Sequence, residues 1–128
     1  DYEITPIEYL AQNFAKEEIT RARTFMGSMK FTHEEMRSKI GSLSGGQRAK
    51  ILFLEMVLKN ANLLLLDEPT RNFSPLSNPV IRRALKDFRG AIISISHDRK
   101  YLNEVCNKIY RLDKNGLTAV SLKDFIDR

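Results

Sequence analysis

The spacing of apolar residues divides this sequence into an opening third with helical periodicity and a remainder in which helices and strands alternate. Thr followed three residues later by Glu, the pattern of a helix capping box, occurs at residues 5–8 and 32–35. We predict helices over residues 6–15, 16–29 and about 32–40. The middle helix carries one apolar stripe, formed by Ile19, Ala22, Phe25, Met26 and Met29. Such a stripe indicates core packing rather than a ligand site.

Buried elements are predicted in the centre of the chain. A helix is expected over residues 45–59, with Asn60 at its C-terminal end. Four consecutive leucines bounded by polar residues indicate a strand over residues 62–67 that is buried on both faces. A helix over residues 78–89 and a second buried strand over residues 91–96 follow.

The last part of the chain is predicted to form a helix, a hairpin and a short final helix. Asp98 is a suitable N-cap for the helix, and Asn115-Gly116 is a strong hairpin signal between strands over residues 108–113 and 117–120. Ser121 begins the last helix. Because helices and strands alternate from residue 45 onward, we expect an α/β fold with parallel strands and an antiparallel end.

Composition excludes several classes of protein. The 128 residues contain 21 Lys and Arg against 16 Asp and Glu, a net charge of +5, and the imbalance lies mostly in the second half. This mild basic bias is compatible with a nucleic-acid surface. The single cysteine, Cys106, forms no intrachain disulfide, which fits a reducing cytoplasm. No apolar run is long enough to span a membrane, and no signal peptide is present at the N-terminus.

Chemistry is first indicated by Leu43-Ser44-Gly45-Gly46-Gln47, which we call the signature segment. Ser44 and Gln47 form a capping box, so a helix begins here. The two glycines leave backbone N–H groups exposed at the positive end of the helix dipole, where an anion such as phosphate binds favourably.

Three further candidates follow the predicted parallel strands. Asp67 and Glu68 end the leucine strand, and His97 comes directly after the next strand. Ligands of open α/β sheets bind at the carboxyl edge of the strands, so these three side chains should lie near one site. His33, at a helix start, has no motif around it and receives no role.

The signature segment and the strand Leu63–Asp67, in this order, resemble the ATP-binding cassette (ABC) ATPases. Leu63–Glu68 is similar to the Walker B strand of that family, and Pro69-Thr70 continues it in the same way. The resemblance covers about residues 43–120. It implies a partial P-loop NTPase core over residues 43–128, preceded over residues 1–42 by the end of an all-helical subdomain.

The resemblance also implies roles for the candidate residues. Asp67 would hold Mg²⁺, Glu68 would polarise the attacking water, and His97 would bond a phosphate oxygen. Two cassettes of this family face each other head to tail. ATP held by a second cassette of the same parent protein would therefore be contacted by the signature residues Ser44, Gly45, Gly46 and Gln47.

The segment Ser96–Leu102 is similar to the ABC-F subfamily, whose members are soluble, bind the ribosome and affect translation or protect against antibiotics. Arg111-Leu112-Asp113 also suits this subfamily. The resemblance implies a cytoplasmic, ATP-hydrolysing parent protein that acts on ribosomes.

Two features depart from the family pattern. No Gly-x-x-x-x-Gly-Lys-Ser/Thr sequence is present; Gly41 to Gly46 has the glycine spacing but continues with Gln47-Arg48. Together with the initial Asp, this suggests the C-terminal half of one cassette, inactive by itself and with apolar strand surface exposed. We expect self-association, or partial coverage of that surface by the N-terminal helices.

The second departure is Ser74, which falls near the position of an Asp that couples the two sites in the family, so this site could be degenerate.

Alternative functions stay open at this level. One is the ATP-binding subunit of a membrane transporter, which the sequence around His97 disfavours. Another is a cassette that binds nucleotide without turnover and serves for docking. A DNA-repair or chromosome-maintenance ATPase is disfavoured because no coiled-coil heptads flank the motifs.

Overall fold

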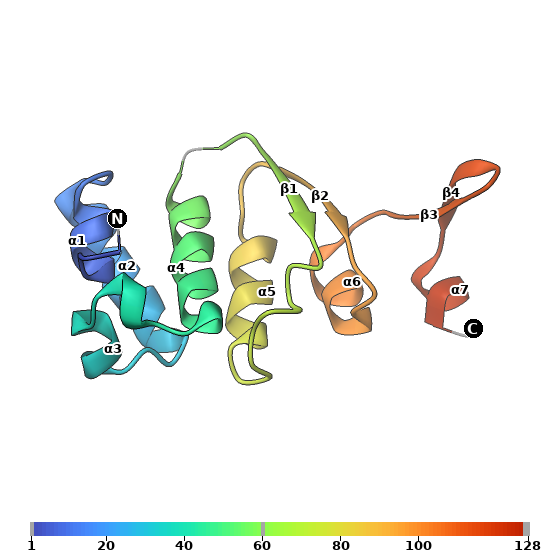
Figure 1. Cartoon of the computed structure of the whole chain (residues 1–128). Helices are drawn as coiled ribbons and strands as arrows, with labels where there is room; N and C mark the ends of the chain where they lie inside the picture. Colours follow the sequence, from blue (N-terminus) through green and yellow to red (C-terminus); the bar gives the residue numbers. More distant parts are fainter. Residues whose placement is uncertain (1, 60, 127–128) are drawn as a thin grey trace.

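The computed structural model describes residues 2–59 and 61–126, which form helices followed by a mixed helix and strand region (Figure 1). The elements in chain order are α1 Pro6–Ala11, α2 Lys16–Ser28, α3 His33–Arg37, a 3₁₀ turn Ile40–Ser42, α4 Gly45–Leu58, β1 Leu63–Asp67, α5 Asn78–Lys86, β2 Ala91–Ile95, α6 Arg99–Val105, β3 Ile109–Asp113, β4 Gly116–Val120 and α7 Leu122–Ile126. The predicted α/β class is confirmed.

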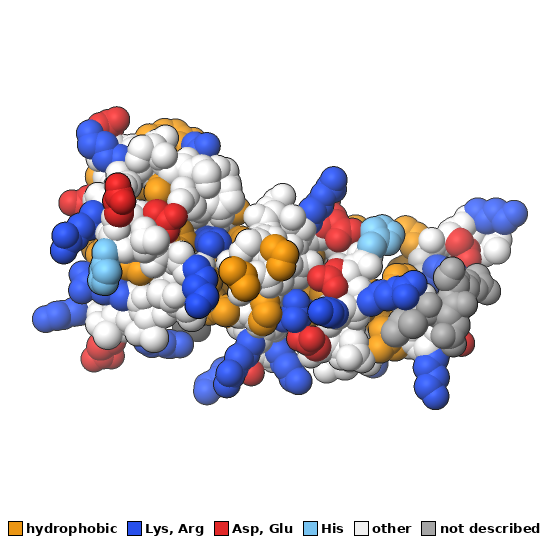
Figure 2. Space-filling model, turned by 90° about the horizontal axis from the view of Figure 1, so that it is seen from below, with side chains coloured by type: hydrophobic (Ala, Val, Ile, Leu, Met, Phe, Trp, Pro, Cys, Tyr) orange, Lys and Arg blue, Asp and Glu red, His pale blue; other side chains and the backbone are white. Residues whose placement is uncertain are grey.

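The molecule is elongated, with its termini toward opposite ends (Figure 1). Helices α1 to α3 form one end and pack against α4. Helix α5 lies between α4 and the pair β1 and β2, and the β3–β4 hairpin with α7 forms the other end. Figure 2 shows Lys and Arg side chains along the whole length of one face, with Asp and Glu among them.

The capping boxes predicted from sequence are present. Thr5 and Thr32 each accept a hydrogen bond from the backbone N–H three residues later, and Glu8 and Glu35 bond back to the cap. Helix α1 is shorter than predicted, because the chain turns after Gln12 with the N–H groups of Asn13 and Phe14 both bonded to one carbonyl, that of Leu10. The third helix ends at Arg37 and is followed by the separate 3₁₀ turn.

The main core lies between the opening helices and α4. Phe25 of α2 stacks on Phe53 of α4 at a centroid distance of 6.2 Å, and Phe73 meets Phe53 edge to face at 5.9 Å. The buried residues of this part include Leu10, Ala22, Met26, Met29, Ile51 and Leu54. The expected stripe of α2 is therefore core packing. Asn60, the predicted helix end, lies outside the described residues, and Lys59 is the C-cap of α4.

Strands β1 and β2 are parallel, with Leu63 opposite Ala91 and Asp67 opposite Ile95. One face packs on the helices through Leu64, which is buried. On the other face Leu65 is 72% exposed, and Leu63, Ile93 and Ile95 are exposed as well. The prediction that these strands are buried on both faces is wrong for this chain. Among the described residues no element covers the second face, and the predicted apolar exposure is confirmed.

The antiparallel end is confirmed. Strand β3 pairs with β4, and Asp113 lies opposite Gly116. The turn itself consists of Lys114 and Asn115, while Gly116 begins β4. Gly116 has a φ of +105°, a backbone conformation that favours glycine. Ser121 and Asp124 bond to each other at the start of α7, as predicted.

Candidate functional site

The two carboxylates at the end of β1 lie in different backbone conformations. Asp67 is the last strand residue, paired with Ile95. Glu68 has a φ of +46°, in the left-handed region that a non-glycine residue seldom adopts. Its N–H still donates to the carbonyl of Ile95 at 2.8 Å. The sheet therefore extends one bond past the strand and then turns sharply at Glu68.

The Glu68 carboxylate points toward the loop that follows β2. Its Oε2 accepts the His97 backbone N–H at 3.4 Å and lies 3.5 Å from the Ser96 hydroxyl. Its Oε1 lies 3.8 Å from His97 Nε2. The Glu68 side chain is 22% exposed, whereas that of His97 is 86% exposed. Glu68 is thus held near the loop, and the imidazole stays open to a ligand.

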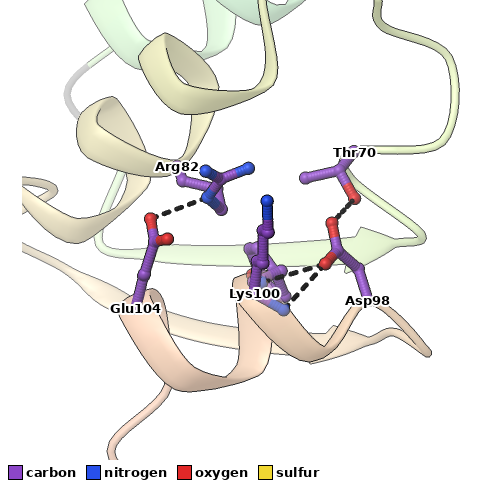
Figure 3. Close-up of polar contacts among 6 residues, drawn as sticks. Thr70, Arg82, Asp98, Lys100 and Glu104 are labelled. Carbon is purple, nitrogen blue, oxygen red and sulfur yellow. Dashed lines mark hydrogen bonds and ion pairs between the residues drawn. The ribbon is translucent and has the colours of Figure 1, made fainter. Parts of the chain in front are cut away.

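A shorter hydrogen bond joins the same two loops (Figure 3). The hydroxyl of buried Thr70 donates to Asp98 Oδ2 at 2.8 Å, and the other carboxylate oxygen accepts the N–H groups of Lys100 and Tyr101 at the start of α6. Burial alone would raise the pKa of Asp98. The bonds from Thr70 and the two N–H groups, with nearby Arg82, outweigh burial and hold that pKa below its ordinary value.

Arg82 links α5 to α6 on the helix side of the strands. Its Nε donates to Glu104 Oε2 at 2.7 Å, and the arginine side chain is mostly buried (Figure 3). Arg82 therefore has an ion-pair partner, and this pair holds together the two helices that cover one face of β1 and β2.

A hollow of about 340 Å³ at the end of β1 is lined by Asp67, Glu68, Arg71 and Asn72. Two adjacent carboxylates supply the hard oxygen ligands that Mg²⁺ prefers. Within residues 2–59 and 61–126, no cluster of three or more His, Cys, Asp or Glu side chains is arranged to hold a metal. Of the four residues that line the hollow, Asp67 and Glu68 carry carboxylates that fit a Mg²⁺ ion.

The signature segment lies at the start of α4. Ser44 accepts the Gln47 backbone N–H, and Gln47 Oε1 accepts the Ser44 backbone N–H at 2.7 Å. The Gln47 side-chain amide also bonds to Glu35. Gly45 and Gly46 are exposed. A side chain at Gly45 would meet no neighbour, which leaves its backbone open to a ligand.

The structure brings Asp67, Glu68 and His97 to one edge, as predicted. The signature segment lies at the start of α4, where the carbonyl of Asn72 is 3.7 Å from the position that a Cβ on Gly46 would take. Sequence reasoning missed the contribution of Thr70 and Ser96. Ser96 could have been found as the residue two before a helix N-cap, since its hydroxyl accepts the Asp98 N–H at 3.1 Å.

The family model described as ABC transporter matches residues 2–71, more than half of the chain. The chain belongs to the ABC transporter family. Its match includes the opening helices, the signature segment and Asp67 and Glu68. No helix that the structure describes has the length and apolar content to cross a membrane.

The curated relatives of this chain include members of ABC subfamily F. It is 31% identical over 120 residues to "ATP-binding cassette sub-family F member 3" from Homo sapiens, covering 94% of this chain and 17% of that protein. It is 33% identical over 107 residues to "Uncharacterized ABC transporter ATP-binding protein YkpA" from Bacillus subtilis (strain 168), covering 82% of this chain and 20% of that protein. The chain thus spans a fifth or less of the length of these relatives.

Solved structures of ABC proteins share the fold. The complex of archaeal ribosomal stalk protein aP1 and archaeal ribosome recycling factor aABCE1 superposes with a TM-score of 0.72 and 20% identity, covering 86% of this chain and 22% of that chain. A putative cobalt transport ATP-binding protein, cbiO-2, superposes with a TM-score of 0.70 and 23% identity, covering 96% of this chain and 49% of that chain. At such identities the likeness shows an ABC-type P-loop NTPase fold and no particular activity.

Proposed function

We propose that this chain is the C-terminal half of one ATP-hydrolysing cassette in a longer ABC-F protein. The observation that carries the proposal is the convergence of Glu68 and His97 at the edge where β1 and β2 end, beside the exposed Asp67. A second cassette of the same protein would complete the ATP sites. Residues 1–42 would belong to the helical subdomain and residues 43–128 to the core.

Each of the three residues at the strand ends, Asp67, Glu68 and His97, has a defined task in this proposal. Asp67 would hold Mg²⁺, which screens the phosphate charge when bound. Glu68 would orient the attacking water and accept its proton, and the exposed His97 imidazole would bond a phosphate oxygen. Phosphoryl transfer depends mainly on positioning and on electrostatic stabilisation, so few groups are needed.

The signature segment would serve a different ATP molecule. Its capping box satisfies the Ser44 and Gln47 backbone groups, and the exposed glycines leave N–H groups at the positive end of a helix of 14 residues. Ser44, Gly45, Gly46 and Gln47 would contact phosphate held by the second cassette. The chain therefore contributes to two composite sites, and within its 128 residues it contains no P-loop sequence of its own.

The test is Glu68→Gln in the full-length protein. The amide keeps the size of the side chain but accepts a proton far less well, so ATP turnover should fall by about 10²- to 10⁴-fold while ATP binding is retained. Glu34→Gln, an exposed glutamate on α3, is the matched control and should keep the original rate. Unchanged turnover with Glu68→Gln would favour a docking cassette without turnover, which the unusual loop Arg71–Ser77 also favours.

The partner that this function predicts is the ribosome. Supporting observations are the identity to subfamily F proteins, the structural likeness to a ribosome recycling factor and the Lys and Arg side chains along one face (Figure 2). Phosphates of RNA attract such a surface in a salt-dependent manner. This assignment also implies a cytoplasmic location.

Sedimentation of the full-length Glu68→Gln protein with purified ribosomes tests the partner. We expect more protein in the ribosome pellet with ATP than without nucleotide. ATP would shift the two cassettes toward the closed shape, and the ribosome would bind more protein if it prefers that shape. The amount should fall at higher salt. Negligible pelleting in all conditions would refute the ribosome assignment, and pelleting with membranes instead would favour a transporter subunit.

A further inference from the structure

Two loops leave the same edge of the β1–β2 pair, and they are joined at two places. At the first, Glu68 Oε2 lies 3.4 Å from the His97 N–H and 3.5 Å from the Ser96 hydroxyl. At the second, Thr70 Oγ1 donates to Asp98 Oδ2 at 2.8 Å. The first connection is long and the second is short, so the second fixes the spacing of the loops more firmly.

The two connections close a ring. The Ser96 hydroxyl that faces Glu68 also accepts the Asp98 N–H, at 3.1 Å. Asp98 is therefore bonded both to the residue that faces Glu68 and to Thr70, two positions beyond Glu68 in the chain. A displacement of Thr70 relative to Asp98 would change the distance between Glu68 and His97.

Asp98 is the fixed side of this ring. Its Oδ1 accepts the N–H group of Lys100 (Figure 3) and that of Tyr101. Tyr101 is fully buried, and its hydroxyl is bonded to Ser94 of β2 at 3.0 Å. Thr70 is 5% exposed, so water does not compete freely for its hydroxyl. The loop after β1 is thereby tied to α6.

Glu68 needs such a restraint. Its φ of +46° lies in a region that costs a non-glycine residue free energy, and such a conformation persists only when surrounding contacts impose it. The Thr70–Asp98 bond lies two residues beyond that point, where it limits how far the backbone can relax.

We propose that Thr70 and Asp98 are positioning residues, which we call the latch, and that they hold Glu68 and His97 in register for ATP hydrolysis. The latch deepens the proposed function and rests on it. It contacts neither nucleotide nor metal in this role, and acts only through the two site residues.

The first test compares Thr70→Val and Thr70→Ser in the full-length protein. Valine keeps the shape but removes the donor, and we expect kcat for ATP to fall by ~10- to 10²-fold with little change in KM, since small displacements of reacting groups have effects of this size. Serine keeps the hydroxyl and should restore most of the rate. Thr118→Val, on the exposed face of β4, is the matched control and should change nothing.

Binding stoichiometry and a double mutant separate positioning from simple loss of fold. The stoichiometry of ATP binding should stay unchanged in Thr70→Val, because the folded fraction is intact. In a Glu68→Gln background Thr70→Val should cause a much smaller loss of turnover than in the original protein, since the carboxylate that it positions is already replaced and only the placement of His97 is left to disturb. Full additivity of the two losses, or a fall in kcat that matches a fall in stoichiometry, would overturn the proposal.

Hydrogen exchange of the full-length protein gives a readout that does not need turnover. Exchange of the peptide containing residues 96–102 should quicken in Thr70→Val, remain normal in Thr70→Ser, and leave peptides of α4 unchanged. If Glu68→Gln alone left turnover intact, the proposed function would fail. The latch would then be judged by exchange, and unchanged exchange in Thr70→Val would overturn it.

Discussion

The helical region of this protein, residues 2–58, and its α/β region, residues 61–126, bury their apolar residues to different degrees. In the helical region, Tyr2 and Leu52 are the large apolar side chains that the structure leaves exposed among the described residues. In the α/β region the corresponding set is Leu63, Leu65, Leu76, Ile93, Ile95, Tyr110, Leu112 and Leu117. Both regions nevertheless form their helices and strands in the predicted order, although several helices, such as α1 and α3, are shorter than predicted.

The difference follows from how each element is completed. A helix satisfies its own backbone hydrogen bonds and needs only one covered stripe, which α2 and α4 give each other. A strand such as β1 needs partners in the sheet and cover on both faces. Among the residues that the structure describes, β1 has one strand partner and one covered face. The α/β region therefore leaves more apolar surface uncovered than the helical region does.

The sharpest test of this comparison is one leucine from each region. Leu54→Ala should lower the free energy of unfolding of the 128-residue chain by about 2–5 kcal/mol, because a fully buried side chain leaves a cavity. Leu65→Ala should lower it by less than about 0.5 kcal/mol, because that side chain is largely exposed. Urea denaturation measures both values. Equal losses would mean that the open face of β1 is covered in solution.

A second test concerns what covers the open face in the isolated chain. The double change Leu65→Lys with Ile93→Lys should weaken self-association by roughly 10-fold or more, because it places two charges on the apolar surface that would pair. Sedimentation velocity over a range of concentrations measures the effect. Leu52→Lys, an exposed apolar residue of α4, is the control and should leave association as it was. A chain that is monomeric before any substitution contradicts the prediction.

A third test uses Glu68, whose strained backbone begins the loop after β1. Glu68→Gly should be more stable than Glu68→Ala by about 1 kcal/mol, because glycine adopts a positive φ without the penalty that a Cβ brings. Both variants remove the carboxylate, so the difference isolates the backbone. Thermal unfolding of the two variants side by side measures it, and identical midpoints would show that the left-handed conformation does not persist in solution.

The smallest expected effect is the pH dependence of Asp98. Its folded pKa is lowered, so its stabilising contribution is present above its unfolded pKa and is lost as the pH falls through the folded value. Between pH 7 and acid below about 4, the original chain should therefore lose more stability than Asp98→Asn. Urea denaturation at several pH values measures this. A parallel loss in both chains would mean that Asp98 is not held as the structure places it.

Local patterns were sufficient to predict most elements and part of the site. The capping residues Thr5, Thr32 and Ser44 each predict the start of a helix, and the pair Asn115-Gly116 is sufficient to predict the hairpin. Asp67, Glu68 and His97 were predicted to share one edge because parallel strands end on the same side. The catalytic and binding roles of these residues remain proposals.

What the sequence by itself determined is the order and type of the elements and the family, since capping, periodicity and motif spacing act within a few residues. What only the tertiary structure decided is which apolar faces are covered and how the loops after β1 and β2 meet. Leu64 and Leu65 each stand between two leucines in the sequence, yet one is buried and the other exposed. The bond from Thr70 to Asp98 spans 28 residues. Such features depend on neighbours brought together by folding, which local residue patterns do not contain.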